Sequence, residues 1–250
     1  LLRQDTALVC VCAVDSELGA VQPISEIAEL LQGYPHCRLH VDATQAVGRT
    51  APIWRGADTV SLAPHKFYGL NGCGLLLKKK NLALEPLIHG GGSTTPYRSG
   101  TPALGLAVSA ETALRLALEN QPQRTARVKA LNQQLRAGLS GYSAVCINSP
   151  NDAVPNILNL SVRGVKGTVF QRALASYGVC VSVKSACSTD GAPSQAVYAV
   201  SRDRRNALSS WRISLSHLTT EAEIAAFLEI FQRCYQGLVP QGLKMEGTAH

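Results

Sequence analysis

The stretch SLAPHKFYGLNGCGLLLKKK, residues 61–80, joins two apolar segments through a glycine-rich turn in which a single lysine, Lys66, stands. The apolar run Thr59–Ala63 predicts a buried strand that ends just before this lysine, and residues 73–79 predict the next strand. Lysine side chains are normally kept on solvated surfaces. Desolvation lowers the pKa of a lysine and makes its amine a nucleophile, so this placement indicates a Schiff-base enzyme.

The segments around this stretch predict an α/β domain. We expect buried strands at three places, residues 7–13, 37–43 and 57–63. A helix with Pro23 at its start and a glycine stop lies between the first two strands. Because strand, helix and strand in short order are typical of a mainly parallel layered sheet, we expect residues 1–120 to form a large domain of this kind.

The rest of the chain predicts a smaller α+β domain, residues 121–250. Two long helices are expected around the boundary, at 103–120 and 125–139. The other predicted elements are strands at 156–162, 179–183 and 211–216, and helices at 167–178, 194–200 and 221–238. The final residues are expected to form a frayed tail.

Composition narrows the class of protein. Of 250 residues, 46% are hydrophobic and 16% are charged, an ordinary globular balance. No apolar run approaches the length of about 18 residues that a membrane span requires, so no membrane association is expected. The net charge of +7 comes from scattered residues without interleaved aromatics, which favours an anionic small ligand over nucleic acid.

The eight cysteines have no regular spacing, which argues against both a disulfide framework and a metal site. Most are expected to be small buried hydrophobic residues, reduced in the cytoplasm. The only methionine is Met245 and the sequence opens on Leu1, so we expect the chain to be a fragment that lacks its N-terminal part.

The sequence also places a carboxylate, Asp42, at the end of a strand that is expected to neighbour the one before Lys66. Asp42 ends the apolar strand in HVDATQAVG, residues 40–48, and parallel strands open onto one carboxyl edge where ligands bind. Pyridoxal phosphate (PLP) needs a lysine for its aldehyde and an acid for its ring nitrogen. The alternatives are that Asp42 only forms a turn and that Lys66 is a surface lysine. Gln45 and His65 beside them favour the cofactor site.

Five motifs occur in a fixed order: HVDATQAVG, APHKFYG, HGGG followed by RSGT, SACS, and WRISLS followed by TTEAEI. In this the chain resembles the NifS/IscS-type cysteine desulfurases, PLP enzymes of the class V aminotransferase group, from about residue 13 to 237. The resemblance implies a PLP-dependent transferase fold of type I. Its large domain would be incomplete here and followed by a small α+β C-terminal domain.

The resemblance also implies roles for the residues of the first half of the chain. Lys66 would carry PLP, and Asp42 would pair with the pyridine nitrogen. Gln45 would hydrogen-bond the O3′ side of the ring, and His65 would lie at the phosphate. Thr101, in RSGT, is similar to the residue that reaches the phosphate of the neighbouring subunit in such homodimers.

Two further residues would act on the substrate. Arg212 resembles the arginine that clamps the substrate α-carboxylate, a task that its bidentate fork suits. Cys187 lies in the small polar stretch VKSACSTDGAP and resembles the cysteine that takes the sulfur as a persulfide. Lys184, three residues earlier, would favour its thiolate form.

The chain departs from the family pattern at several positions. Ser16 stands where an asparagine usually contacts PLP, so its place in the cofactor site is an expectation only. The other departures are Asp15, Ala63, Ser93–Thr95 and Ser216. The family's first hundred-odd residues have no counterpart, and each missing phosphate donor costs roughly 1.5–3 kcal/mol. We therefore expect this chain to bind PLP weakly and to be inactive on its own.

The implied reaction is the removal of sulfur from L-cysteine, giving L-alanine and an enzyme persulfide. The sulfur would pass to an acceptor protein, a scaffold or carrier, for iron–sulfur clusters or thio-cofactors. Three alternatives remain: a selenocysteine lyase, another class V PLP enzyme, or a non-catalytic homologue that serves as a dimerisation or binding module.

Overall fold

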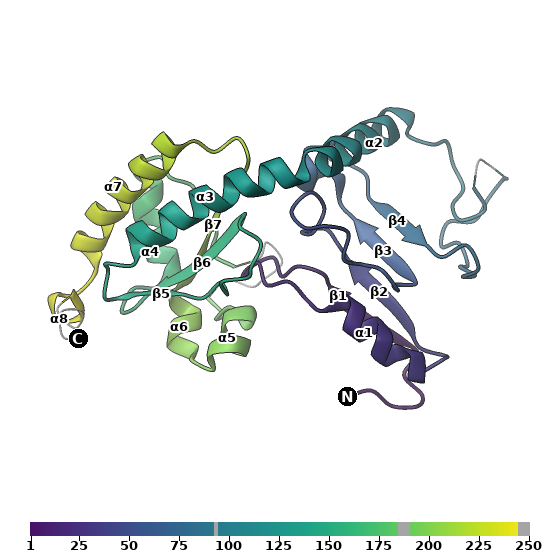
Figure 1. Cartoon of the computed structure of the whole chain (residues 1–250), viewed down its shortest axis with the longest axis horizontal. Coiled ribbons are helices and arrows are strands. Elements are labelled where there is room, and N and C mark those ends of the chain that lie inside the picture. Colours follow the sequence, from purple (N-terminus) through teal and green to yellow (C-terminus); the bar gives the residue numbers. More distant parts are fainter. Residues whose placement is uncertain (93–94, 185–190, 245–250) are drawn as a thin grey trace. The chain divides into compact units, whose positions relative to one another are not determined.

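The computed structural model describes residues 1–92, 95–184 and 191–244, and the chain divides into two compact units (Figure 1). The first unit comprises residues 1–14 and 22–121, and the second unit comprises 15–21 and 122–250. The short segment 15–21 thus belongs with the C-terminal part of the chain, although in sequence it lies within 1–120.

The first unit is built on one four-stranded sheet. Its strands, in spatial order, are β1 (Leu8–Cys12), β2 (Arg38–Asp42), β3 (Thr59–Leu62) and β4 (Leu75–Lys78). The pairs β1–β2 and β2–β3 are parallel and β3–β4 is antiparallel. The predicted mainly parallel sheet is confirmed, with each strand slightly shorter than predicted.

The connections between these strands follow the signals in the sequence. The helix expected from Pro23 is α1 (Ile24–Leu30), with Pro23 as its N-cap, and it runs into the 3₁₀ helix η1 (Leu31–Gly33). A second 3₁₀ helix, η2 (Pro64–Phe67), follows β3. The long apolar helix is α2 (Leu104–Glu119), as expected.

The two faces of this sheet differ in burial. Leu39 and Val41 of β2 are buried, whereas Arg38 is exposed and Asp42 half-buried, because successive side chains of a strand point to opposite faces. The expectation that 7–13 is a fully buried strand is wrong, since β1 alternates between exposed and half-buried residues. The face of β2 that carries His40 and Asp42 is therefore partly accessible to solvent.

The second unit contains a three-stranded antiparallel sheet and most of the helices. Its strands, in spatial order, are β5 (Val145–Ile147), β6 (Ile157–Val162) and β7 (Ser210–Ser214). Its helices are α3 (Gln121–Leu139, which starts at the last residue of the first unit), α4 (Gly167–Ala175), α5 (Gln195–Ser201), α6 (Arg204–Ser209), α7 (Glu221–Leu238) and α8 (Gln241–Lys244).

Several elements differ from prediction. Residues 179–183 do not form a strand, and only Ser182 makes a bridge, to Arg212. β5 and α6 were not predicted because they are too short for a periodic pattern to emerge. The expected frayed tail contains α8, whose Leu243 carbonyl accepts a hydrogen bond of 2.7 Å from the Ser143 hydroxyl.

The core of the second unit is aromatic. Trp211, Phe170 and Phe231 are fully buried, and the rings of Phe170 and Trp211 stack with centroids 5.3 Å apart. Helices α3, α4 and α7 supply this core on one face of the sheet, and α6 lies on the other (Figure 1). With both faces covered, all six residues of β6 are buried.

Two expectations drawn from composition can be compared with the structure. No helix among the described residues is long and apolar enough to cross a membrane. The seven described cysteines are free thiols, but the expectation that most are buried is wrong, because only Cys37 and Cys234 are. The exposed ones are Cys10, Cys12, Cys146 and Cys180.

Candidate functional site

Asp42 and Lys66 leave neighbouring parallel strands at the same edge of the sheet. Asp42 ends β2 and pairs in register with Ser61 of β3, and the Ala43 N–H donates a 3.0 Å hydrogen bond to the Ser61 carbonyl. Lys66 follows in η2, three residues after Ala63, whose carbonyl its own N–H contacts at 2.9 Å. The carboxyl edge of parallel strands is the usual place for a ligand.

Asp42 also shapes the turn that follows it. One carboxylate oxygen, Oδ1, accepts a hydrogen bond of 2.9 Å from the Thr44 N–H. Asp42 therefore does form a turn, as the alternative interpretation expected, but with only one of its two oxygens. No bond within the described part of the chain engages Oδ2. A half-buried carboxylate with one oxygen fixed by the backbone and the other free is oriented for a cationic partner.

Lys66 is held on a rigid turn but is not enclosed. Pro64 and Phe67 of η2 are buried, whereas His65 and Lys66 between them are exposed. Tyr68 closes the turn with φ +75°, and the next residue must be Gly69, since a Cβ there would lie 2.8 Å from the Pro64 Cβ. The expected desolvation of the Lys66 amine is wrong for this structure, because the turn packs its apolar residues inward and leaves the lysine outside.

The other expected cofactor residues of the first unit lie apart from this turn in sequence. Gln45 is half-buried just beyond Asp42, and its side-chain oxygen accepts a hydrogen bond from Arg49. Thr101 is exposed before α2, and its carbonyl is within 3.5 Å of the Arg98 guanidinium. The contact proposed for Thr101 with a neighbouring subunit remains an expectation.

Ser16 and Arg212 meet in the second unit. Arg212 lies on β7, and its Nη1 donates a hydrogen bond of 2.6 Å to the Ser16 carbonyl. Burial lowers the pKa of the Arg212 guanidinium, and the negative charges of Glu17 and Asp15 act in the opposite direction. Its Nε is buried with no hydrogen-bond partner among the described residues. A buried donor without an acceptor favours an anionic ligand such as a carboxylate.

Cys187, the expected sulfur acceptor, lies outside the described residues. Glu17 and Ser194 are two buried polar residues that the sequence analysis did not single out as site residues, and they bond to each other next to Arg212. A sequence signal for Glu17 is its place directly after Asp15 and Ser16, two positions at which the chain departs from the family pattern.

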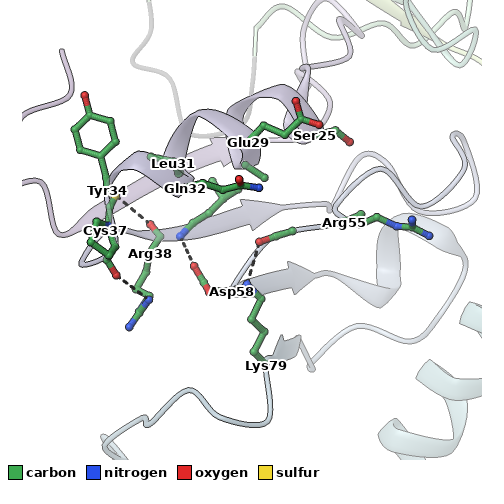
Figure 2. Close-up of a pocket in the computed structure, with 14 residues that line it drawn as sticks. Ser25, Glu29, Leu31, Gln32, Tyr34, Cys37, Arg38, Arg55, Asp58 and Lys79 are labelled. Carbon is green, nitrogen blue, oxygen red and sulfur yellow. Dashed lines mark hydrogen bonds and ion pairs between the residues drawn. The ribbon is translucent and has the colours of Figure 1, made fainter.

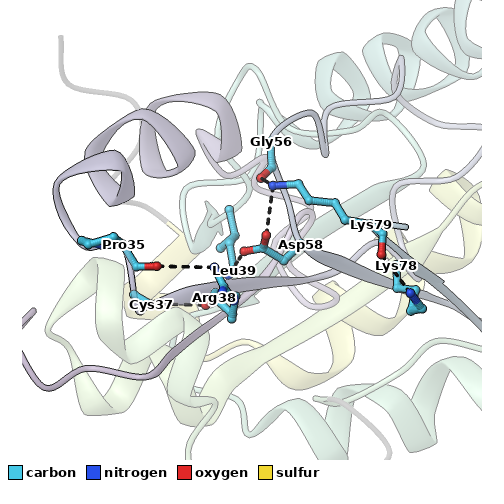
Figure 3. A network of polar contacts seen from close by, with 8 residues as sticks. All are labelled: Pro35, Cys37, Arg38, Leu39, Gly56, Asp58, Lys78 and Lys79. Carbon is cyan, nitrogen blue, oxygen red and sulfur yellow. Dashed lines mark hydrogen bonds and ion pairs between the residues drawn. The ribbon is translucent and has the colours of Figure 1, made fainter. Parts of the chain in front are cut away.

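A cavity of about 530 Å³ opens at the other end of the parallel strands (Figure 2). Asp58, which precedes β3, accepts hydrogen bonds of 2.8 Å from the Leu39 N–H and 2.9 Å from Lys79 Nζ there (Figure 3). This cluster links the amino ends of the parallel strands β2 and β3 to the carboxyl end of the antiparallel strand β4. Arg38 and Arg55 at its rim point away from each other in Figure 2, and the lysine and the carboxylate that meet there, Lys79 and Asp58, already pair with each other.

The chain is similar to known proteins over most of its length. The aminotransferase class-V family model matches residues 1–227. A "NifS/IcsS protein homolog" of Lactobacillus delbrueckii subsp. bulgaricus is 33% identical over 94% of this chain and 63% of its own length. An "IscS-like cysteine desulfurase" of Mycobacterium tuberculosis is 36% identical over 91% of this chain and 59% of its own.

Among solved structures, one described as a "NIFS-LIKE PROTEIN" superposes with a TM-score of 0.86 at 30% identity, covering 95% of this chain and 63% of that one. The chain thus spans about 60% of the length of the relatives it matches. The expected fold is confirmed: a PLP-type transferase fold, of which this chain contains part. With a parallel sheet that carries Asp42 and Lys66 at one edge, and a family model that matches most of its length, this chain belongs to the class-V aminotransferase family.

Proposed function

We propose that the chain is part of a cysteine desulfurase that uses PLP to remove sulfur from L-cysteine. The observation that carries the proposal is the pairing of Asp42 with the β3 end that leads to Lys66. The similarity to relatives called cysteine desulfurases supports it further. PLP, when bound, supplies a protonated ring that accepts the electron pair released at the substrate Cα.

Lys66 and Asp42 are suited to the two ends of such a cofactor. The Lys66 amine would bind the aldehyde and then move the proton of the substrate Cα. The free oxygen of Asp42 would hold a proton on the ring nitrogen, since a carboxylate favours the charged form of a neighbouring base. His65, Gln45 and Ser16 would orient the cofactor, as the family motifs imply.

Arg212 and Cys187 would act on the substrate itself. The guanidinium of Arg212 would bind the α-carboxylate, for which its buried, unsatisfied Nε offers a donor. The Cys187 thiolate would attack the substrate sulfur, so that an S–S bond forms while the C–S bond breaks. The electron pair of that bond stays on the carbon, which is protonated to give alanine.

The proposal includes partners of two kinds. A sulfur-acceptor protein must take the persulfide sulfur, and a second copy of the chain would bring Thr101 to the neighbouring phosphate. The exposed apolar residues Leu104 and Val108, one turn apart on α2 and 72% and 64% exposed, support a protein contact there. We also propose that the protein works in the cytoplasm, where thiols stay reduced.

Titration with PLP tests the cofactor role of Lys66. The full-length protein that contains this chain should develop the visible absorption band of lysine-bound PLP, and Lys66→Ala should lose it completely. Lys80→Ala, which removes another exposed lysine of the first unit, should keep the band. A band that survives Lys66→Ala would contradict the assignment. No band in the full-length protein would favour the non-catalytic binding module.

Addition of L-cysteine tests the reaction. Sulfide and alanine should appear in equal amounts with a reductant present, and Cys187→Ala should abolish both while keeping the PLP band. Cys180→Ala, at an exposed cysteine seven positions away, should be unaffected. Sulfide release by Cys187→Ala at the wild-type rate would remove the persulfide role.

A further inference from the structure

Glu17 is a buried carboxylate with a specific partner. Its Oε2 accepts a hydrogen bond of 2.5 Å from the hydroxyl of Ser194, which is 1% exposed. The same hydroxyl accepts a bond of 3.1 Å from the Val197 N–H and thereby caps α5. A buried carboxylate is costly unless it is bonded, so this pair holds Glu17 and the start of α5 together.

Glu17 belongs to the turn that contacts Arg212. The Asp15 carboxylate accepts bonds from the N–H groups of Glu17 at 2.9 Å and Leu18 at 2.6 Å, which fixes the turn. Within this turn the Ser16 carbonyl accepts the Arg212 Nη1. Glu17 therefore lies one residue from the group that holds the guanidinium, and its charge faces Arg212 from the same turn.

Two described stretches of the chain, one before residue 185 and one after residue 190, are attached to this arrangement. On the N-terminal side, Ser182 and Arg212 exchange backbone hydrogen bonds of 3.1 and 2.7 Å. Lys184, with φ +65°, donates from Nζ to the Ala192 carbonyl at 2.7 Å. On the C-terminal side stands Ser194. We call residues 182–184 and 192–194 the two stems.

These bonds form a closed circuit. It runs from Ser182 to Arg212 through the backbone, from Arg212 to the 15–17 turn through the guanidinium, and from Glu17 to Ser194 through the carboxylate. The Lys184–Ala192 bond crosses between the stems. Such a circuit is more rigid than its separate bonds, since each one limits the freedom of the next.

We propose that Glu17 is a positioning residue that holds the Arg212 guanidinium and both stems in one hydrogen-bonded unit, so that the guanidinium keeps a fixed orientation toward a substrate carboxylate. This inference rests on the proposed function. Glu17 touches neither substrate nor cofactor in this scheme and acts through Ser194 and through the turn beneath Arg212.

Hydrogen exchange on the full chain tests the link without substrate or cofactor. Glu17→Ala should speed exchange of the Ser182 and Val197 amides about tenfold, because the stems lose their common anchor. Glu17→Gln keeps an oxygen that can accept from Ser194 and should stay near the wild-type rate. Glu229→Ala, an exposed carboxylate on α7 paired with Arg233, is the matched control and should change nothing.

Steady-state kinetics separate positioning from a general loss of folded protein. Glu17→Ala should raise the KM for L-cysteine about tenfold, with a smaller fall in kcat, and Glu17→Gln should restore most of the KM. A fall in kcat at constant KM would indicate fewer folded molecules and would overturn the proposal. Unchanged exchange at both amides in Glu17→Ala would overturn it as well.

The exchange and kinetic experiments together distinguish failure of the proposed function from failure of the Glu17 proposal. If the full-length protein releases no sulfide, the proposed function fails, whereas the exchange experiment still decides whether Glu17 links the stems to Arg212. If sulfide is released normally and Glu17→Ala matches the wild type in KM, only the positioning role is lost.

Discussion

The two units present their functional side chains in opposite settings. In the first unit, Lys66 and His65 are exposed on a 3₁₀ turn whose apolar residues face inward. In the second, Arg212 is half-buried against Ser16, and Glu17 and Ser194 beside it are buried and bonded. The second unit holds Arg212 and Glu17 by hydrogen bonds, whereas the first leaves the Lys66 amine exposed on a turn at the edge of the sheet.

The second unit also has the more extensive hydrophobic core. The three largest fully buried side chains, Trp211, Phe170 and Phe231, all belong to the second unit. In the first unit the sheet exposes apolar side chains such as Leu76, which is 57% exposed. The second unit should therefore be more sensitive to core substitutions, and its free energy of unfolding should be less dependent on a ligand.

The largest expected effect is in the aromatic core. Phe231→Ala should lower the free energy of unfolding of the second unit by about 3–5 kcal/mol, through lost burial and the cavity left behind. Leu76→Ala in the first unit should change stability by less than about 0.5 kcal/mol. Urea unfolding can follow the second unit by Trp211 fluorescence in a Trp54→Phe background, and the first unit by Trp54 fluorescence in a Trp211→Phe background. Equal losses would remove the contrast.

A smaller effect is expected at the amino edge of the first sheet. Burial raises the pKa of Asp58, but the Leu39 N–H and Lys79 outweigh it, and the net pKa is lowered. Asp58→Ala should cost about 1–3 kcal/mol, because it leaves the Leu39 N–H unsatisfied. Asp5→Ala, at an exposed ion pair, is the control and should cost at most about 1 kcal/mol.

The lowered pKa of Asp58 also sets the direction of a pH effect. Its stabilisation is present above the carboxyl's unfolded-state pKa and is lost as the pH falls through the lower folded-state value. Acidification should therefore weaken the first unit of the wild type more than that of Asp58→Ala. Parallel acid unfolding curves for the two proteins would contradict this role.

The smallest effect concerns the start of α7. Thr220 accepts a bond from the Glu223 N–H while the Glu223 carboxylate bonds back to Thr220, a capping box. Thr220→Ala should lower the free energy of unfolding of the second unit by about 1 kcal/mol, measured by Trp211 fluorescence in urea. Thr220→Ser, which keeps the hydroxyl, should stay close to the wild type. A loss as large as that of Phe231→Ala would show that the cap matters as much as the aromatic core and would contradict this ranking.

Local patterns predicted most elements because each had a regular signal of its own. Short apolar runs predicted the strands β2 and β3. The helix α7 was predicted by its apolar residues at helical spacing, which begin after Thr220 and Glu223. The second half was harder. The run at 179–183 has the composition of a strand, yet it makes only one bridge, because pairing depends on a neighbour that the local sequence does not show.

The sequence by itself determined the parallel sheet and the positions of Asp42 and Lys66 at its edge, since strand ends follow directly from apolar runs and the turns after them. Only the tertiary structure decided burial and partners. It left Lys66 and four of the cysteines exposed, and it brought Glu17 to Ser194 across 177 positions. The physical reason is that exposure and long-range hydrogen bonds depend on which surfaces pack together, and no local period encodes that.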